Sequence, residues 1–208
     1  PARRDRIRAD AASGFPAEAG PYHLYVSLAC PWAHRTLIAR ALKGLQEVIS
    51  VSAVEPVMTQ GWSFSPELPD ALPGFEHLHQ LYTLADPHYS GRVLVPVLWD
   101  RQRRTIVSNE SSEILRMFDE AFAGCGAWGP GLYPEPLRAE IDAVNADAYE
   151  NINTGVYRCG FATEQGAYER AFERLFAALD RMEARLARQR WLVDSHQPTE
   201  ADSGLFTT

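Results

Sequence analysis

Cysteine, long apolar runs and excess positive charge are all scarce in this chain, and each scarcity argues against a class of protein. Its 208 residues hold only three cysteines, Cys30, Cys125 and Cys159, which lie far apart. An odd number of well-separated cysteines argues against a disulfide scaffold and for a reducing compartment, so we expect a cytoplasmic protein. No segment approaches the roughly 18 apolar residues of a membrane helix, so no membrane partner is expected. The net charge of −7 argues against nucleic acid as a partner.

Metal-ligand spacing and internal repeats are missing too. The six histidines show no zinc-type spacing, because His77 and His79 lie in a polar stretch and Cys30 with His34 forms only a single i, i+4 pair. We therefore predict no metal.

The first ten residues, PARRDRIRAD, carry two aspartates and lack an apolar core, so we expect a solvated arm and not a secretory signal.

Hydrophobic residues make up 46% of the chain and aromatic residues 11%, enough for a packed core. In the first part, alternating or valine- and isoleucine-rich runs predict strands, and apolar residues at helical spacing predict helices. The predicted strands are 22–28, 47–56, 92–100 and 105–108, and the predicted helices are 32–44 and 109–122, the second with Asn109 or Ser108 as its N-cap. Residues 57–91 show no clear period and are predicted to be a long loop.

Glycine and proline crowd residues 123–136, which predicts a linker, and the pattern beyond it is helical. Two apolar stripes are predicted to pack in a core: Leu137, Ile141, Val144 and Ala148, and then Tyr168, Phe172, Leu175, Phe176, Leu179, Met182 and Leu186. Thr199 and Asp202 predict a helix start with a capping box. The order of elements predicts an α/β thioredoxin-like domain over 20–122, followed by an all-α domain over 134–208.

Cys30 lies at the junction between the first predicted strand and the first predicted helix. Pro31 suits the first turn of a helix, where its missing N–H is no loss. Unpaired N–H groups and the helix dipole favour negative charge there, so we expect a nucleophilic thiolate with a lowered pKa. A small buried hydrophobic residue is the alternative. Position 33 is Ala, so a Cys-x-x-Cys dithiol is absent.

Six motifs in order resemble the glutathionyl-hydroquinone reductases, the Xi class of glutathione transferases. They are Cys-Pro-Trp-Ala at 30–33, Gly-Trp-Ser-Phe at 61–64, Val-Pro-Val-Leu-Trp-Asp at 95–100, Asn-Glu-Ser-Ser-Glu-Ile at 109–114, NINTGVYRCGFATEQ at 151–165 and TEAD at 199–202. The first and fourth motifs also fit other cysteine-type transferases, including the omega class. The second and fifth are more specific. The resemblance runs from about residue 20 to the end, and it implies a glutathione-transferase helical domain in the second half.

The resemblance implies a glutathione site in the first domain, with glutathione as co-substrate. Val95 would pair with the cysteinyl part of glutathione, and the Val95–Pro96 bond would be cis. Glu110 and Ser111 would bind the γ-glutamyl end, because first-turn N–H groups and a serine hydroxyl suit its carboxylate and Glu110 suits its ammonium. Ordinary helix capping is the alternative for this pair. Trp62 is expected to be a lid on glutathione, with a core tryptophan as the alternative.

Two further residues are implied by the same resemblance. Arg92 would contact glutathione, although an ordinary surface arginine fits its position equally well. Tyr157 would lie beside the aromatic substrate and donate a proton to the ring carbon that loses sulfur. A half-buried structural tyrosine is the alternative. Cys125 and Cys159 are expected to be inert.

The implied reaction is glutathione-dependent reduction of glutathionyl-hydroquinones through a Cys30–glutathione mixed disulfide, which a second glutathione resolves. The family protein is expected to be a homodimer. An omega-like thioltransferase or dehydroascorbate reductase would need Cys30 but not Tyr157. A non-catalytic glutathione-binding remnant is the third interpretation. It is motivated by the C-terminal helices that the family has beyond LFTT, where the chain stops just after a helix start, so we expect an incomplete helical domain. Ser203 and Gly204 also depart from the family pattern, which bears on stability, dimerisation and activity.

Overall fold

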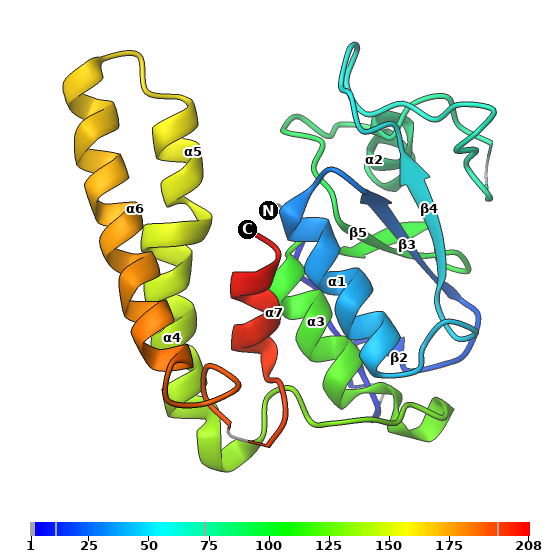
Figure 1. The fold of residues 1–208 in the computed structure, drawn as a ribbon. Coiled ribbons are helices and arrows are strands. Elements are labelled where there is room, and N and C mark those ends of the chain that lie inside the picture. Colours follow the sequence, from blue (N-terminus) through cyan, green and yellow to red (C-terminus); the bar gives the residue numbers. More distant parts are fainter. Residues whose placement is uncertain (1–2, 11, 73, 195) are drawn as a thin grey trace. The chain divides into compact units, whose positions relative to one another are not determined.

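The computed structural model describes residues 3–10, 12–72, 74–194 and 196–208, and it contains two compact units, Pro1–Gly129 and Pro130–Thr208 (Figure 1). The first unit is built on a sheet with strand order β4-β3-β5-β6. Its strands are β3 (Tyr22–Ser27), β4 (Ser50–Val54), β5 (Val97–Asp100) and β6 (Thr105–Ser108). β4 is parallel to β3, whereas β5 is antiparallel to both of its neighbours, β3 and β6. This mixed sheet is the thioredoxin-like arrangement that the order of elements predicts.

Three α-helices accompany this sheet. They are α1 (Pro31–Leu42), α2 (His79–Ala85) and α3 (Ser111–Glu120), and α3 is followed by a short 3-10 helix, η1 (Phe122–Cys125). α1 and α3 pack side by side, and α2 contacts β6 (Figure 1). All six residues of β3 are buried, because this strand is flanked by β4 and β5 within the sheet. The sequence predicts the four strands of this sheet and the helices α1 and α3. The predicted bounds match for β6, are too long at one end for β3 and β5 and at both ends for β4 and α3, and are shifted by one to two residues for α1.

The prediction of an unbroken loop over 57–91 is wrong, because α2 lies within it. Leu81 and Tyr82 of this helix are buried. The helix has only seven residues and no side-chain N-cap, so it offers fewer than two full turns of periodicity to detect.

The predicted solvated arm is wrong in part: most side chains between residues 3 and 10 are exposed, but the backbone there is bonded to the sheet and Ile7 is buried. The N–H of Asp5 donates to Val107 O (2.9 Å), and the N–H of Asn109 donates to Arg3 O (3.1 Å). Ile7 is only 3% exposed. The arm therefore covers the outer edge of β6, whose free hydrogen-bonding groups attract a further chain segment. It also contributes β1 (Ile7–Arg8), which pairs with β2 (Phe15–Pro16).

The second unit is helical. Its elements are η2 (Glu135–Leu137), α4 (Arg138–Ala148), the π-helical turn η3 (Tyr149–Asn153), α5 (Gly155–Gly160), α6 (Gln165–Leu186) and α7 (Glu200–Phe206). α4, η3 and α5 form one nearly continuous helical segment, and α6 runs back alongside it (Figure 1).

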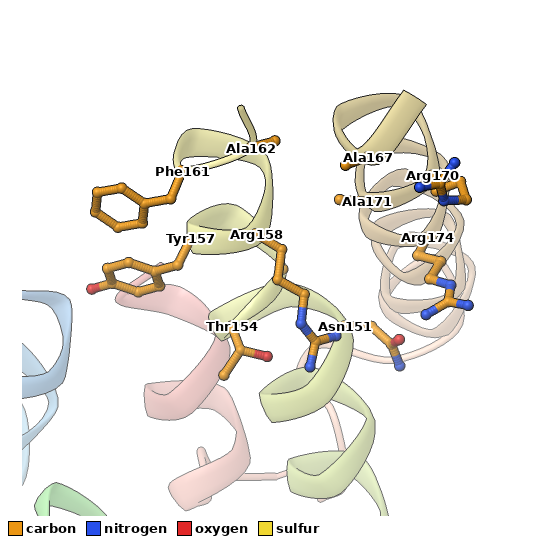
Figure 2. A pocket seen from close by; sticks show the side chains of 11 residues that line it. Asn151, Thr154, Tyr157, Arg158, Phe161, Ala162, Ala167, Arg170, Ala171 and Arg174 are labelled. Atoms are coloured by element: carbon orange, nitrogen blue, oxygen red, sulfur yellow. The ribbon is translucent and has the colours of Figure 1, made fainter. Parts of the chain in front are cut away.

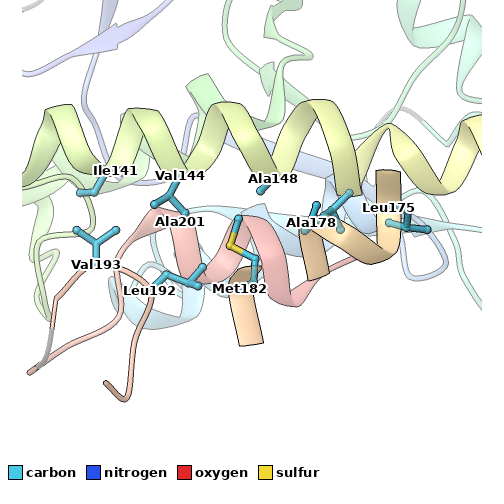
Figure 3. Close-up of a cluster of buried hydrophobic side chains, with 10 residues drawn as sticks. Ile141, Val144, Ala148, Leu175, Ala178, Met182, Leu192, Val193 and Ala201 are labelled. Carbon is cyan, nitrogen blue, oxygen red and sulfur yellow. The ribbon is translucent and has the colours of Figure 1, made fainter. Parts of the chain in front are cut away.

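A hydrophobic core joins α4, α6, α7 and the loop after α6 (Figure 3). Its buried members are Ile141, Val144, Ala148, Ile152, Leu175, Ala178, Met182, Leu192, Val193 and Ala201. The capping box predicted for α7 is confirmed, because the N–H of Thr199 donates to Asp202 Oδ2 at 2.8 Å and the reciprocal bond is formed. Asp202 Oδ1 also accepts the N–H of Leu192 at 2.7 Å, which ties the loop to the helix start.

The longer apolar stripe of α6 is only partly in this core. Leu175 and Met182 are buried as predicted. Five other members are between 36% and 46% exposed, namely Tyr168, Phe172, Phe176, Leu179 and Leu186. The prediction that the whole stripe packs in the core is therefore wrong for these five, because only the side of α6 that faces the other helices of this unit is covered.

Candidate active site

Three of the predicted site segments meet at one end of the sheet. Cys30 follows β3, the Val95–Pro96 pair precedes β5, and Glu110 follows β6. β5 runs antiparallel to both β3 and β6. The last residues of β3, the first residues of β5 and the last residues of β6 therefore lie at the same end of the sheet. The topology thus brings together residues that lie far apart in the sequence.

Cys30 is the N-cap residue of α1, with an extended backbone (φ −96°, ψ 116°), and Pro31 opens the helix as predicted. The half-buried Cys30 side chain places Sγ 3.7 Å from the carbonyl oxygen of Val95. The Val95–Pro96 peptide bond is cis, as the family resemblance implied. The thiol therefore faces the backbone that precedes β5.

The pKa of the Cys30 thiol is raised above its ordinary value, chiefly by burial. The backbone N–H groups of Ala33 and Trp32 and the charge of Arg35 act in the opposite direction, but burial outweighs them. The prediction of a lowered pKa is therefore wrong. The helix N-terminus acts as predicted, whereas the extent of burial could not be seen in the sequence. Arg35, which we did not single out, is buried and lies over the Trp32 ring, 4.8 Å from its centroid.

Tyr82 is a second residue that sequence reasoning missed. Its buried hydroxyl donates to Leu94 O (2.8 Å), accepts from Leu94 N–H (3.2 Å) and accepts from Asn109 Nδ2 (3.1 Å). Burial raises the pKa of Tyr82 to about 12, so the hydroxyl stays protonated. Tyr82 thus links the segment before β5 to the segment after β6. No sequence signal marked it, because it lies in the unpredicted helix α2.

The N-cap of α3 is Glu110, and the predicted choice of Asn109 or Ser108 is wrong. The Glu110 carboxylate accepts from the Ser112 N–H (3.2 Å) and from the Ser112 hydroxyl (3.0 Å). The Asn109 side chain does not cap the helix, because its Oδ1 accepts the Arg3 N–H (3.3 Å) and its Nδ2 donates to the Tyr82 hydroxyl (3.1 Å). The structure therefore shows the capping role of Glu110 that was the alternative to ligand binding.

Ser111 is the first residue of α3 and is buried at 3% exposure. Its position puts a hydroxyl beside first-turn N–H groups, which is a setting that favours an anion. A carboxylate could bind at this end of α3, next to the edge where Cys30 lies.

Trp62 is half-buried in the loop after β4. The N–H of Glu55 donates to Ser63 O (2.8 Å), and the Trp62 carbonyl accepts the N–H of Leu78 (2.9 Å). Ser63 and His77 form an antiparallel bridge. Because β4 is parallel to β3, this loop leaves the sheet at the same end as Cys30.

Arg92 is exposed, three residues before Val95. Its carbonyl accepts the Tyr89 hydroxyl (2.8 Å), and its guanidinium forms no ion pair with the residues that the structure describes. The charge is thus available to an anionic ligand.

Tyr157 lies in the second unit, on α5 directly after the π-helical turn. The Thr154 hydroxyl donates to the carbonyls of Tyr149 (2.9 Å) and Glu150 (2.8 Å) and so closes that turn. The Tyr157 side chain is 37% exposed, and its ring stacks with that of Phe161. A cavity of about 630 Å³ opens beside it between α5 and α6, and Asn151, Thr154 and Arg158 line it from the α5 side (Figure 2).

Neither a metal-binding cluster nor a membrane-spanning helix occurs among the described residues. No group of three or more histidine, cysteine or carboxylate side chains is arranged to hold a metal ion among those residues. None of the helices there combines the length and apolar character needed to cross a membrane.

Comparison with known proteins identifies the family. Residues 29–121 match the profile of the glutathione S-transferase N-terminal domain, and residues 165–208 match the C-terminal domain. The glutathione-bound structure of YqjG, a glutathione transferase homolog from Escherichia coli K-12, is 52% identical with a TM-score of 0.97, covering 100% of this chain and 70% of that one. A Xi-class transferase from Natrialba magadii is 48% identical with a TM-score of 0.95, covering 99% and 66%. The chain belongs to the Xi-class glutathione transferases.

Two curated relatives of this Xi-class transferase carry the name glutathionyl-hydroquinone reductase. YqjG from Escherichia coli (strain K12) is 54% identical over 200 residues, which are 94% of this chain and 61% of YqjG. PcpF from Sphingobium chlorophenolicum is 50% identical over 210 residues, which are 99% of this chain and 67% of PcpF. The chain thus spans about two thirds of the length of these relatives. The predicted family and the predicted fold, a thioredoxin-like domain followed by an all-α domain, are confirmed.

Proposed function

We propose that this Xi-class transferase reduces glutathionyl-hydroquinones to hydroquinones, with Cys30 as the nucleophile and glutathione as co-substrate. The observation that carries the proposal is the position of Cys30 at the N-terminus of α1, with Sγ 3.7 Å from the Val95 carbonyl. The similarity to two proteins named glutathionyl-hydroquinone reductase supports the choice of substrate.

The reaction balances as a two-electron reduction of the conjugate. The Cys30 thiolate attacks the glutathionyl sulfur, a disulfide bond forms, and the bond between sulfur and the ring carbon breaks. The electron pair of that bond goes to the ring carbon, which takes a proton from the Tyr157 hydroxyl. A second glutathione thiolate then attacks the mixed disulfide, which releases glutathione disulfide and restores Cys30.

Glutathione would be held by backbone and side-chain groups at the end of the sheet where Cys30 lies. The Val95 backbone would pair with its cysteinyl part, and Ser111 with the N-terminus of α3 would take its γ-glutamyl carboxylate. Glu110 would receive the γ-glutamyl ammonium, since its carboxylate is exposed where it caps the helix. Arg92 offers a guanidinium without an ion pair among the described residues, and it would bind a second carboxylate.

Trp62 would cover bound glutathione, and Pro96 would present the Val95 backbone.

We place the reaction in a reducing compartment, the cytoplasm, because Cys30, Cys125 and Cys159 are all free thiols. The complete protein would act as a homodimer, without metal, nucleic acid or membrane partners.

Mass spectrometry of the intact chain tests the proposal. After a short incubation with a glutathionyl-hydroquinone, one glutathione adduct should appear on Cys30 as hydroquinone is released. Cys30→Ser should abolish both the adduct and turnover, and Cys159→Ser, as the matched control, should keep both. Turnover that survives in Cys30→Ser would refute the mechanism.

Tyr157→Phe separates this reaction from the alternatives. Loss of a positioned general acid should slow hydroquinone release by about 10²–10⁴-fold. Full activity of Tyr157→Phe, together with disulfide reduction by the parent chain, would favour an omega-like thioltransferase or dehydroascorbate reductase. Glutathione binding with no adduct on Cys30 would favour the non-catalytic interpretation.

A further inference from the structure

A hydrogen-bond network ends at the backbone that faces Cys30. Leu94 directly precedes Val95 and lies between α2 and β5, where the chain forms neither helix nor strand. The Tyr82 hydroxyl donates to Leu94 O (2.8 Å) and accepts from the Leu94 N–H (3.2 Å). One side chain of α2 thus gives Leu94 the two bonds that a residue of a neighbouring strand would otherwise provide.

The network continues from the Tyr82 hydroxyl to the N-terminal arm, residues 3–10. Asn109 Nδ2 donates to this hydroxyl at 3.1 Å and so uses its second acceptor position. Asn109 Oδ1 accepts the Arg3 N–H (3.3 Å), and the Asn109 N–H donates to Arg3 O (3.1 Å). The arm therefore holds Asn109 both by its side chain and by its backbone.

The arm is itself fastened to the two elements that flank the network. The N–H of Asp5 donates to Val107 O in β6 at 2.9 Å. The Arg3 guanidinium pairs with the carboxylate of Asp86, the C-cap of α2, at 2.8 Å. The arm thus joins the helix that carries Tyr82 to the strand that leads into Asn109.

Both side chains in the middle of the network are almost completely buried. Tyr82 is 1% exposed and Asn109 is 5% exposed. A buried polar group that loses its partner is not readily compensated by water, so the backbone must shift or bear the loss. The network therefore fixes the position of the segment that contains Leu94.

This position matters for the proposed site because backbone pairing with a peptide ligand depends on distance and direction. In the proposed function, the Val95 backbone pairs with the cysteinyl part of glutathione. The Val95 carbonyl also lies 3.7 Å from Cys30 Sγ. A shift of this backbone would move the partners of the ligand relative to the sulfur that attacks it.

We propose that Tyr82 and Asn109 are positioning residues, which set the Val95 backbone for the cysteinyl part of glutathione, and that the N-terminal arm holds Asn109 for this task. The inference rests on the glutathione site of the proposed function. Tyr82 acts through Leu94, and Asn109 acts through the Tyr82 hydroxyl.

Disulfide exchange at Cys30 tests this without a hydroquinone. The Cys30 thiolate attacks glutathione disulfide, a mixed disulfide forms on Cys30, and one glutathione thiolate leaves. Hydroxyethyl disulfide reacts in the same way but has no peptide backbone for Val95 to pair with. Mass spectrometry of the intact chain measures both rates, and their ratio reports how well the peptide is positioned.

Tyr82→Phe should slow the reaction with glutathione disulfide by roughly two- to tenfold, the range for a lost hydrogen bond. The reaction with hydroxyethyl disulfide should keep its rate. Asn109→Ala should change the ratio in the same direction. The double variant should change it by less than the product of the two separate effects, because both residues act through one network.

Two control variants should leave the ratio unchanged. Thr83→Val removes a hydroxyl from the same helix, where it bonds only to the carbonyls of His79 (3.3 Å) and Gln80 (3.1 Å). Ile49→Val weakens the core of the same unit just before β4, at the end of the sheet away from Cys30. Equal slowing with both disulfides in Tyr82→Phe and Asn109→Ala would refute the positioning role, and so would an unchanged ratio.

Turnover of a glutathionyl-hydroquinone by the parent chain separates this inference from the proposed reaction. If the parent does not reduce the conjugate but Tyr82→Phe lowers the ratio, the reaction fails and the positioning role stands. If the parent reduces the conjugate and neither variant changes the ratio, the reaction stands and the positioning role fails.

Discussion

At the scale of single residues, Cys30 experiences two opposing influences. Its place at a helix N-terminus gives it two backbone N–H groups and the nearby charge of Arg35, all of which favour the thiolate. Burial favours the thiol and has the larger effect. A ligand that brings positive charge or further hydrogen-bond donors to the sulfur would therefore change its reactivity strongly.

Alkylation by iodoacetamide should reveal this balance, because only the thiolate reacts. We expect the rate at Cys30 to rise with pH and to reach its midpoint above the ordinary thiol pKa. Arg35→Gln should move the midpoint further up, since the guanidinium lowers the pKa. Mass spectrometry between about pH 6 and pH 10 measures the rate. A midpoint below the ordinary value would contradict the dominance of burial.

Tyr82 shows how much one unpredicted hydroxyl can organise. Tyr82→Phe removes the partner of the Asn109 amide and of both backbone groups of Leu94. Buried groups left without partners should cost about 1–3 kcal/mol of unfolding free energy, measured by urea denaturation. Tyr89→Phe is the control, because its bond to the Arg92 carbonyl is exposed to solvent, and it should cost much less. Equal losses would contradict the role assigned to Tyr82.

At the scale of elements, α6 has a buried side and an uncovered side that the sequence alone does not distinguish. Leu175→Ala opens space in the core of the second unit and should cost about 2–5 kcal/mol. Phe172→Ala removes a larger side chain that is 40% exposed, and we expect a loss below about 1 kcal/mol. Chemical denaturation of the two variants measures the difference. A larger loss in Phe172→Ala would mean that this face is covered in solution.

Elements with local signals could be predicted from the sequence. The four strands of the larger sheet, α1, α3 and the capping box of α7 are marked by apolar period, by Pro31 or by the Thr199–Asp202 pair. α2 and η3 were missed, because a seven-residue helix and a π-helical turn carry no such pattern. The N-terminal arm was missed because its partner, β6, lies about a hundred residues away. Periodicity identified the apolar face of α6 but not how much of it has a partner.

The site residues also divide into those with a local sequence signal and those without one. A strand followed by Cys-Pro marked Cys30, and the family motifs added Val95, Pro96 and Glu110. Tyr82 and Arg35 act through contacts that only the fold creates, so residue type and spacing could not reveal them.

At the scale of the molecule, stability should depend on pH through His23 in the central sheet. Its Nδ1 lies 2.6 Å from Ser50 Oγ, and its Nε2 lies 2.9 Å from Ser52 Oγ. Burial, and secondarily the charges of Arg101 and Arg40, lower the pKa of His23 from 6.5 to about 4. The unfolded chain therefore binds a proton more readily than the folded one between these values.

Stability should thus fall as the pH drops from 6.5 towards 4, by up to roughly 3 kcal/mol from this group. Urea denaturation at several pH values measures the effect. His23→Gln keeps a side chain that can bond to both serines but does not titrate, so its stability should decline less over the same range. Parallel pH profiles for the two proteins would exclude His23 as the cause.

The order of strands in the first unit has a consequence for the chain as it is synthesised. Cys30 and α1 leave the ribosome early, whereas the segment that faces the sulfur and the helix that begins after Glu110 are made much later. During that interval the thiol has the local groups of α1 but lacks the burial that raises its pKa and the Val95 carbonyl 3.7 Å from Sγ, so it is open to oxidation. Docking of the segment before β5 beside Cys30 therefore also marks the point at which the nascent protein begins to protect its own nucleophile.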